Sequence, residues 1–192
     1  TYSTRIFVGY NRLFYSNVNY LKEMFTKQNK KMFCYCSLPE KSETNVITNT
    51  CHTISILFFL FGDLRIVFTK KTNKYLFSYI KSKKCEIFIK IYFNAFENFK
   101  IDINTQRMFY KFNTIEKLEI YNGLKVKKFN QYKTYSPNKI KTIDEFKRDN
   151  FKPGFLNQSK EFYNFVKIKK YKYINNISLS LKIINICRKL LK

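Results

Sequence analysis

The sequence predicts an α+β fold, in which an open, mostly antiparallel β-sheet has helices packed on one face. The patterns in the 192 residues run strand, helix, strand, helix, then several strands and two final helices. Connections within the run of strands are too short for helical crossovers, so neighbouring strands are expected to pair as hairpins. With 45% hydrophobic residues, the chain can also bury a sizeable core.

The first elements alternate between strand and helix. Residues 5–10 are short, apolar and β-rich, which predicts a buried strand. Ser16 is placed to cap a helix over 16–25, where apolar residues recur at helical spacing. Residues 31–38 predict a second strand, and the alternation in it puts Cys34 and Cys36 on the same, buried side.

The segment 45–62 predicts the central helix of the domain. Its polar first half holds His52, the only histidine, and its second half holds the apolar run 56–61. Gly62 is expected to end the helix, because only glycine enters the left-handed conformation without steric cost. The helix is therefore expected to be anchored in the core at its C-terminal end and to present His52 to a cleft.

The second half of the chain predicts the remaining sheet and two helices. Strands are expected over residues 65–68, 75–81, 85–93, 100–103, 107–112 and 117–121. Asn122-Gly123 is a turn signal, and 124–135 reads as a further edge strand protected by lysines. Helices are expected over 155–166 and 178–191, the latter capped by Ser178.

The composition leaves two function classes open and disfavours others. A net charge of +24 fits a nucleic-acid-binding protein, but the lysines are scattered, and the residues that AT-rich codons specify are all abundant. Five cysteines without CxxC spacing predict free thiols in a reducing, cytoplasmic setting, with no metal site. The sequence has no run of about 18 apolar residues, so no membrane-spanning helix is predicted, and no signal peptide is recognised at its start.

Five segments, in order, resemble the C-terminal part of the Gfo/Idh/MocA family of NAD(P)-dependent oxidoreductases. Segment 49–63 is like the family's helix in which a His precedes an apolar run that ends in Gly. Segment 151–166 is like the family's late segment, with Gly-Phe and a Gln before an aromatic-rich helix. The segments are IFVGYNRLFYSNVNYLK (6–22), KMFCYCSL (31–38), NTCHTISILFFLFGD (49–63), FKPGFLNQSKEFYNFV (151–166) and NISLSLKIINICRKLL (176–191).

The resemblance implies a division of the chain and an activity. Residues 1–12 would be the last strand of a Rossmann domain that is otherwise missing, and 13–192 a substrate-binding and oligomerisation domain. The complete enzyme would use NAD or NADP to transfer a hydride to or from a sugar, nucleotide sugar or cyclitol. The domain is expected to bind that small molecule, the missing Rossmann domain and, through its sheet, further copies of itself.

The resemblance also implies a site. His52 matches the family's catalytic histidine, and imidazole is suited to accept a hydroxyl proton near neutral pH. Asn11 and Arg12 would lie at the domain junction near substrate, together with Thr48 and Asn49 on the polar half of the helix. The family usually has Asp at the positions of Thr48 and Ser55, so both are departures from its pattern.

The cofactor-binding half is absent from the sequence. The four glycines, at positions 9, 62, 123 and 154, cannot form a GxGxxG fingerprint. The isolated chain is therefore expected to bind no dinucleotide and to be inactive alone. Two alternatives remain: a non-catalytic oligomerisation scaffold, and a basic nucleic-acid-binding module with a lysine stripe on one sheet face.

Overall fold

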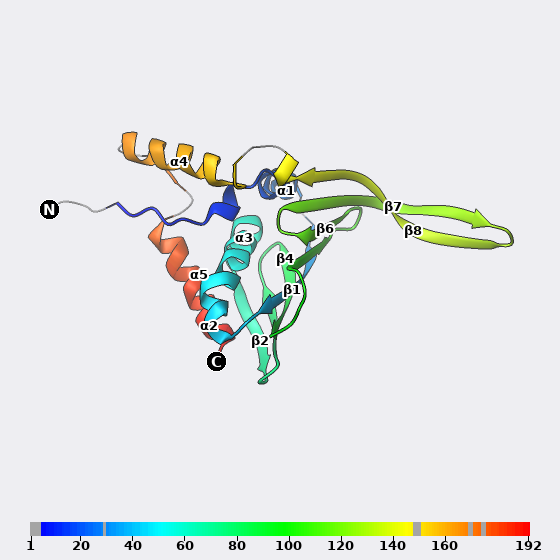
Figure 1. Cartoon of the computed structure of the whole chain (residues 1–192), viewed down its shortest axis with the longest axis horizontal. Coiled ribbons are helices and arrows are strands. Elements are labelled where there is room, and N and C mark those ends of the chain that lie inside the picture. Colours follow the sequence, from blue (N-terminus) through cyan, green and yellow to red (C-terminus); the bar gives the residue numbers. More distant parts are fainter. Residues whose placement is uncertain (1–4, 29, 148–150, 169–170, 174–175) are drawn as a thin grey trace.

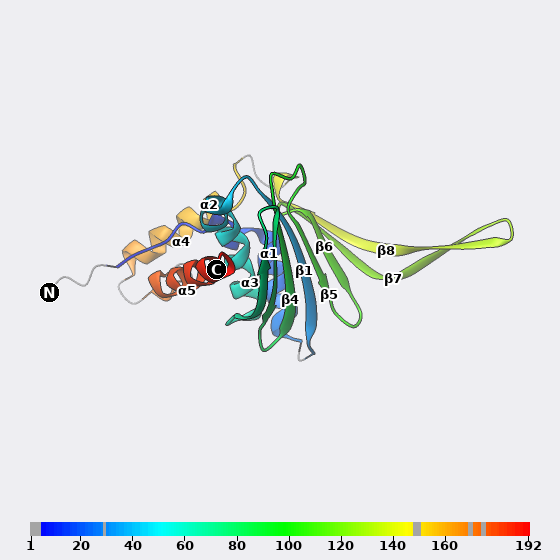
Figure 2. The same cartoon turned by 90° about the horizontal axis from the view of Figure 1, so that it is seen from below.

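In this computed structural model, the described residues are 5–28, 30–147, 151–168, 171–173 and 176–192. They form one eight-stranded sheet with the helices gathered on one side of it (Figures 1 and 2). The predicted α+β fold, largely antiparallel with helices on one face, is confirmed. The strands are β1 (Met32–Glu40), β2 (Arg65–Lys71), β3 (Tyr75–Lys81), β4 (Cys85–Phe93), β5 (Lys100–Asn104), β6 (Phe109–Thr114), β7 (Lys117–Phe129) and β8 (Tyr132–Asp144).

Five α-helices and three short turns complete the described elements. The central helix is continuous over α2, a wide π-type turn (Val46–Thr50) and α3, and 3₁₀ turns occupy Asn11–Phe14 and Glu145–Lys147. The helices are α1 (Ser16–Thr26), α2 (Glu43–Asn45), α3 (Cys51–Phe61), α4 (Phe155–Lys167) and α5 (Ile177–Leu190).

The sheet order is β2-β3-β4-β1-β5-β6-β7-β8. Hairpin pairing of sequence neighbours is confirmed for every consecutive pair from β2 onwards except β4 and β5, where it is wrong. Strand β1 lies between those two, parallel to β4 and antiparallel to β5. The parallel pair is reached through a long crossover that contains α3 and the β2–β3 hairpin, as a parallel connection requires.

The predicted N-terminal strand is wrong for residues 5–10. This segment forms no strand ladder in the structure. Instead, the Phe7 ring packs against Phe162 and Phe165 of α4, with ring centroids 5.5 Å apart in both pairs. A strand needs a neighbour to take its backbone hydrogen bonds, and the described chain offers the segment none. Residues 1–4 of the expected Rossmann remnant lie outside the described residues.

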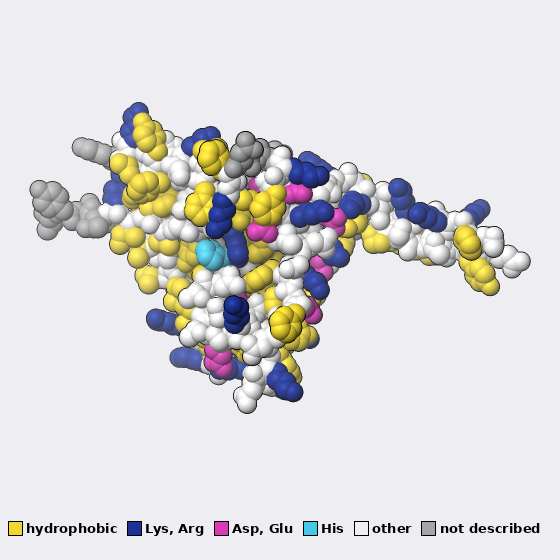
Figure 3. Space-filling model, viewed as in Figure 1, with side chains coloured by type: hydrophobic (Ala, Val, Ile, Leu, Met, Phe, Trp, Pro, Cys, Tyr) yellow, Lys and Arg dark blue, Asp and Glu magenta, His cyan; other side chains and the backbone are white. Residues whose placement is uncertain are grey.

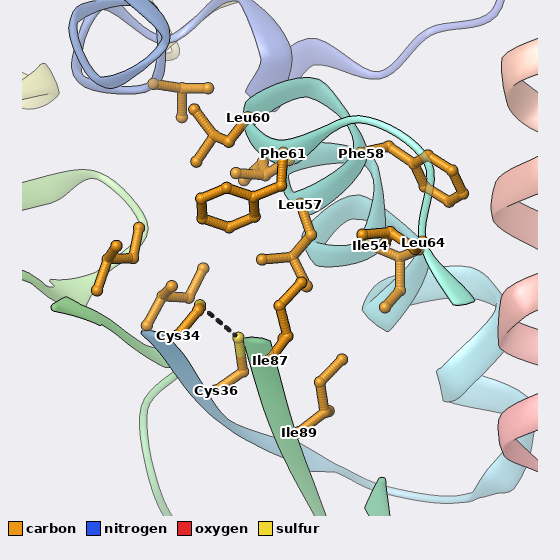
Figure 4. Close-up of a cluster of buried hydrophobic side chains, with 14 of the residues drawn as sticks. Cys34, Cys36, Ile54, Leu57, Phe58, Leu60, Phe61, Leu64, Ile87 and Ile89 are labelled. Atoms are coloured by element: carbon orange, nitrogen blue, oxygen red, sulfur yellow. Dashed lines mark hydrogen bonds between the residues drawn. The ribbon is translucent and has the colours of Figure 1, made fainter. Parts of the chain in front are cut away.

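Helix α3 is anchored as its sequence predicts. Gly62 has a φ of 82°, and its N–H donates to the Phe58 carbonyl at 2.9 Å, so it ends the helix. Figure 4 shows Leu57 and Phe61 lying between the helix and the strands, next to side chains from β1 and β4. Cys34 and Cys36 share this buried face as expected, with their Sγ atoms 3.8 Å apart.

The predicted turn at Asn122-Gly123 is wrong. The chain instead passes through a β-bulge there, with Gly123 at φ 66°, and turns only after Phe129, with Asn130 at φ 53°. Residues 124–135 are therefore not one edge strand but the outer part of the long β7–β8 hairpin. A glycine that tolerates positive φ serves a bulge as well as a turn, so the dipeptide could not distinguish them.

Both predicted serine caps are wrong. Helix α5 is capped by Asn176, whose side-chain oxygen accepts the Leu179 N–H at 2.9 Å. Ser16 is the first residue of α1, and the carboxylate of Glu145 accepts from its N–H at 3.2 Å and from the Asn17 N–H at 2.8 Å. A buried carboxylate at a helix N-terminus satisfies free amides and suits the helix dipole.

One helix, Glu43–Phe61, is long and apolar enough to cross a membrane by length and composition alone. The expectation that no segment approaches that length is therefore too strict. Most of this helix is buried inside the fold, against the sheet and α5. Its apolar character is accounted for by its position in the core.

Replacing Leu57 by Ala should destabilise the domain by about 2–5 kcal/mol, because the side chain is fully buried and its loss leaves a cavity. Urea unfolding followed by circular dichroism measures this change. Leu181→Ala on the exposed face of α5 is the matched control and should change stability by no more than about 0.5 kcal/mol. Equal effects of both substitutions would contradict the assigned core.

Candidate functional site

The candidate site lies where β1 ends and the central helix begins. The 3₁₀ turn Asn11–Phe14 supplies Arg12, the C-terminal end of β1 supplies Glu40, and the helix supplies Asn49 and His52. Figure 3 shows the histidine at the surface of the body, beside basic and apolar side chains. Three segments that are separate in the sequence therefore meet at one surface.

The polar half of the helix is not a regular α-helix. Residues 46–50 form a wide π-type turn, which takes more residues per turn than the α-helix that continues from Cys51. In a regular α-helix, Thr48 and His52 would lie one above the other on the same face, because they are four residues apart. The wide turn rotates Thr48 away from that position. Thr48 is exposed, and its hydroxyl donates back to the Thr44 carbonyl at 3.4 Å.

Glu40 is a buried carboxylate at the base of the site, with 4% of its surface exposed. It accepts hydrogen bonds from the Asn49 amide at 3.1 Å and from the Thr50 hydroxyl. Burial raises the pKa of Glu40, while these two hydrogen bonds and the charge of Arg12 oppose the rise. The carboxylate thus fixes the wide turn and the orientation of the Asn49 amide.

His52 is half-buried, and the Tyr10 ring meets it edge-on with the centroids 5.7 Å apart. Burial, and secondly the positive charge of Arg12, lower its pKa to about 4. Its Nδ1 atom is buried and has no hydrogen-bond partner among the described residues. The imidazole is therefore neutral at pH 7, and its enclosed Nδ1 is left without a hydrogen bond among the described residues.

Arg12 contributes a second unsatisfied group. One guanidinium nitrogen, Nη1, is buried without a hydrogen-bond partner among the described residues. The guanidinium carbon lies 5.7 Å from the centroid of the Phe99 ring, which positions the side chain. Unpaired buried donors are costly, so this nitrogen opposes the stability of the fold as long as it has no acceptor.

A hollow of about 570 Å³ is lined in part by Glu40 and Asn49, and it adjoins Arg12 through the Phe99 ring. It combines amide, carboxylate and ammonium groups with the apolar faces of two phenylalanines, a combination that suits a small hydroxylated ligand. A second hollow of about 140 Å³ joins Arg12 to Phe99 and Glu116. The larger hollow is lined by Pro39, Glu40, Lys41, Asn45, Asn49, Asn94, Ala95, Phe96, Glu97, Asn98 and Phe99.

Gly154 keeps the Arg12 turn in place. It has a φ of 79°, and a side chain at this position would collide with the Asn11 carbonyl oxygen and approach the Tyr15 ring to 2.8 Å. Asn11 in turn donates from its amide to the Pro153 carbonyl at 3.5 Å. The close approach of these two segments explains the glycine, and Asn11 makes its contact with backbone rather than with the hollow.

The structure gathers part of the predicted set. Arg12, Asn49 and His52 lie at the site, whereas Asn11 and Thr48 bond to backbone, and Ser55 donates to the His52 carbonyl at 2.7 Å. Sequence reasoning missed Glu40, which lies two residues beyond the predicted strand 31–38. Its only signal was its position at the end of an apolar strand. The described residues contain no cluster of three groups that could hold a metal.

No family model matches the chain, and no curated protein matches it. Solved structures do. A dehydrogenase from Clostridium difficile superposes with a TM-score of 0.66 at 14% identity, over 96% of this chain and 61% of its own. A Gfo/Idh/MocA family oxidoreductase from Vibrio cholerae gives a TM-score of 0.60 at 11% identity, over 96% and 61%.

Two further structures share the fold and carry names that bear on ligands. UDP-N-acetylglucosamine 3-dehydrogenase from Acidithiobacillus ferrooxidans gives a TM-score of 0.64 at 10% identity, over 97% of this chain and 60% of its own. An oxidoreductase from Agrobacterium radiobacter, in complex with NAD+, L-tartaric acid and magnesium, gives 0.62 at 11% identity, over 96% and 61%.

The chain thus spans about 60% of the length of the solved structures it matches. At these identities the likeness establishes the fold. The expected resemblance to the C-terminal part of Gfo/Idh/MocA oxidoreductases is confirmed at that level.

His52 should make stability depend on pH. Because its pKa is about 4 in the fold and 6.5 in the unfolded chain, the unfolded state binds the extra proton between these values. The stabilisation is fully present above pH 6.5 and is lost as pH falls toward 4, by roughly 2–3 kcal/mol. Urea unfolding of the wild type and His52→Gln from pH 4 to 7.5 measures it.

The difference between the two proteins isolates His52, because Glu40 and the other titrating groups are common to both. A difference that stays constant across this pH range would show that the imidazole is not desolvated as described.

Proposed function

We propose that this chain is the substrate-binding part of an NAD(P)-dependent oxidoreductase that acts on a sugar, a nucleotide sugar or a cyclitol. The observation that carries the proposal is that His52, Arg12 and Asn49 meet at one surface, where Asn49 lines a hollow, in a fold shared with dehydrogenases. The names of the structural neighbours support the reaction class and the substrate class.

His52 is the proposed base. Oxidation of an alcohol requires the hydroxyl to lose a proton as hydride leaves the carbon. The imidazole is neutral at pH 7, and Nε2, rather than the buried Nδ1, is the ring nitrogen proposed to accept the proton of a substrate hydroxyl. Its low pKa makes His52 a weak base in the free domain. The negative charge that develops on the substrate oxygen as its proton leaves would raise that pKa and favour the cationic imidazole.

The other residues of the site are proposed to bind and orient substrate. Arg12 offers a buried donor that suits a phosphate or carboxylate oxygen. Asn49 and Thr48 offer polar groups at the helix start, and Glu40 acts through Asn49 as a positioning residue. Asn11 remains a proposed substrate contact through the same turn as Arg12.

NAD or NADP is the proposed cofactor of the complete enzyme, where it would accept or supply the hydride. This chain lacks the glycine pattern that cradles a pyrophosphate, so a separate dinucleotide-binding part is required. Exposed apolar side chains on α4 and the adjoining N-terminal segment support a surface for that part. They are Ile6, Phe155, Phe162, Tyr163 and Val166.

The open sheet face is the proposed contact between copies of the chain. On this face, which points away from the helices, Phe88 stacks with Tyr79 at 4.7 Å and approaches Phe33 and Phe77 at 5.3 and 5.8 Å. Phe33 is 42% exposed. A contiguous aromatic surface of this kind supports association.

A cytoplasmic location is also proposed. All five cysteines are free thiols and all are buried. Free thiols are usual where the surroundings are reducing, which supports that compartment.

A non-catalytic scaffold is the second candidate. A catalytic imidazole is normally oriented by an acceptor on its other nitrogen, and here Nδ1 has no such partner among the described residues. The exposed Thr48, in place of an acidic residue, also favours this reading.

The coding sequence upstream of Thr1 should encode a strand, a GxGxxG turn and a helix within ~120 residues, because the glycines of that fingerprint have no substitute here. Sequencing the transcript tests this. In parallel, NADH fluorescence titration of the isolated 192-residue chain should show no saturable binding. Tight NADH binding by the chain alone would contradict the proposed division of labour.

In the complete protein, His52→Gln should lower kcat for a sugar substrate by about 10²–10⁴-fold, because the proton acceptor is lost. Ser55→Ala is the matched control on the same helix, since its hydroxyl bonds to backbone, and it should leave kcat within about twofold. Steady-state assays with NAD+ and NADP+ measure both. Unchanged kcat in His52→Gln, with normal thermal stability, would favour the scaffold.

A further inference from the structure

The outer part of the β7–β8 hairpin projects from the body of the domain as an arm (Figures 1 and 2). The arm comprises residues 122–137, and every one of them is exposed. A two-stranded hairpin without a supporting layer is marginally stable in water, so these residues contribute little to the core of the domain. Their side chains are available to a partner.

The arm is basic and holds no carboxylate. Residues 120–143, which contain it, include six lysines and neither Asp nor Glu. Lys139 pairs with Glu119 at 2.7 Å, and no carboxylate among the described residues pairs with the other five. Figure 3 shows the dark-blue basic side chains along the arm and on the part of the body beside it. The six are Lys125, Lys127, Lys128, Lys133, Lys139 and Lys141.

The pairing of β7 with β8 decides which way each lysine faces. Ile120 is buried under the helices, and its partner in β8 is Lys141. The Lys141 Nζ atom lies 4.4 Å from the centroid of the Tyr20 ring in α1, so Lys141 is on the helix-facing side of the sheet. Strand β8 has one extra residue at the register shift between Ile120 and Tyr121, which puts Lys139 on the opposite, open side.

Beyond Lys139, strand alternation brings residues 136, 134 and 132 of β8 to the helix-facing side, together with their partners in β7. That side of the arm therefore combines two lysines, two hydroxyl groups and two aromatic rings. Its cross-strand pairs are Lys125 with Ser136, Lys127 with Thr134, and Phe129 with Tyr132. The open side of the arm carries Leu124 with Pro137, Val126 with Tyr135, and Lys128 with Lys133.

The helix-facing side of the arm leads into a hollow of about 380 Å³ at its base. Lys141 and Lys147 line this hollow, together with the Tyr20 ring. The acidic residue in the lining, Asp144, accepts the Phe146 N–H at 3.1 Å. One track of lysines and rings thus runs from the tip of the arm to the body. We call it the lysine track, and it consists of Lys125, Lys127, Lys141, Lys147, Phe129 and Tyr132.

We propose that the lysine track binds a single-stranded nucleic acid without sequence preference. Proteins that do so combine a row of positive charge along the phosphates with aromatic side chains on which bases stack. Alternate residues of a strand lie about 6.6 Å apart, so Lys125 and Lys127 match the spacing of successive phosphates in an extended strand. Phe129 and Tyr132 then offer their rings to bases at the tip of the arm.

A single strand fits the arm better than a membrane surface does. Membrane binding buries an apolar face in lipid and keeps lysines at its edge. On the open side of the arm, Leu124 and Val126 are followed toward the tip by Lys128 and Lys133, and the turn itself is Asn130-Gln131. A polar tip flanked by lysines opposes insertion, whereas rings beside lysines suit bases and phosphates.

This binding goes beyond the proposed oxidoreductase function. The lysine track is on the helix-facing side of the hairpin, so it leaves the open sheet face available. None of its residues lines the hollow beside Asn49. Nucleic-acid binding and substrate binding can therefore be measured separately.

The test is fluorescence anisotropy of a fluorescein-labelled oligo(dT) strand of about 12 nucleotides, titrated with the full 192-residue chain. Phosphate contacts by the lysines of the track predict that the logarithm of the association constant falls with the logarithm of salt concentration with a slope of about −2.8. Lys125→Gln with Lys127→Gln should raise Kd at least tenfold and make the slope shallower by about 1.4.

Lys128→Gln with Lys133→Gln is the matched control, because it removes the same charge from the opposite side of the same hairpin. It should change Kd by no more than about threefold. Phe129→Ala should raise Kd about fivefold or more at an unchanged salt slope, because a stacking contact is lost. Val126→Ala, on the other side, should leave Kd within about twofold. Near-UV circular dichroism and melting temperatures confirm that each variant is folded.

Four results would overturn the proposal. Absence of saturable oligo(dT) binding at low salt removes the ligand. Equal weakening by the two lysine pairs shows a general attraction to positive charge without a track. Tighter binding of a duplex of the same length, with no loss in Phe129→Ala, shows that no base is stacked. Lost binding to phosphatidylserine vesicles in the Lys125/Lys127 variant, with oligo(dT) binding unchanged, assigns the arm to a membrane surface. Enzyme activity enters none of these readouts, so they are independent of the proposed function.

Discussion

The burial of α3 against the inner face of the sheet is the interaction on which the rest of the domain depends. Leu57 and Phe61 fill the space over β1 and β4, and α5 covers the other side of the helix. This packing is non-directional, but it fixes the depth and rotation of the helix. Because His52 is on the first turn of the same helix, the core also determines where the imidazole meets the surface.

On this helix, the same groups that suit a ligand-binding site also reduce the stability of the fold. A regular helix over 46–50 would leave no wide turn, and the buried Glu40 carboxylate would have to find other donors for its lone pairs. Unpaired groups on Arg12 and His52 and a desolvated imidazole all oppose stability. Such groups concentrate at ligand-binding sites because a ligand can complete them, and the apolar half of the helix stabilises the fold enough to tolerate them.

The two faces of the sheet divide the remaining surfaces. Helices cover one face of the central strands, and α4 carries exposed aromatic side chains outward from that layer. The other face stays open, with aromatic rings in mutual contact. Neither of these exposed aromatic surfaces includes a residue that lines the hollow next to Asn49.

The sequence by itself determined the elements whose reasons are local. Gly62 ended the central helix, the alternation in 31–38 put Cys34 and Cys36 inward, and the order of segments indicated the fold. Tertiary structure decided what depends on partners distant in sequence: β1 between β4 and β5, Glu145 as the cap of α1, and Glu40 beside Asn49. The reason is that a backbone amide or a buried carboxylate needs a partner but does not specify which one. Residues 5–10 show the converse, since strand propensity formed no strand where no neighbour was present.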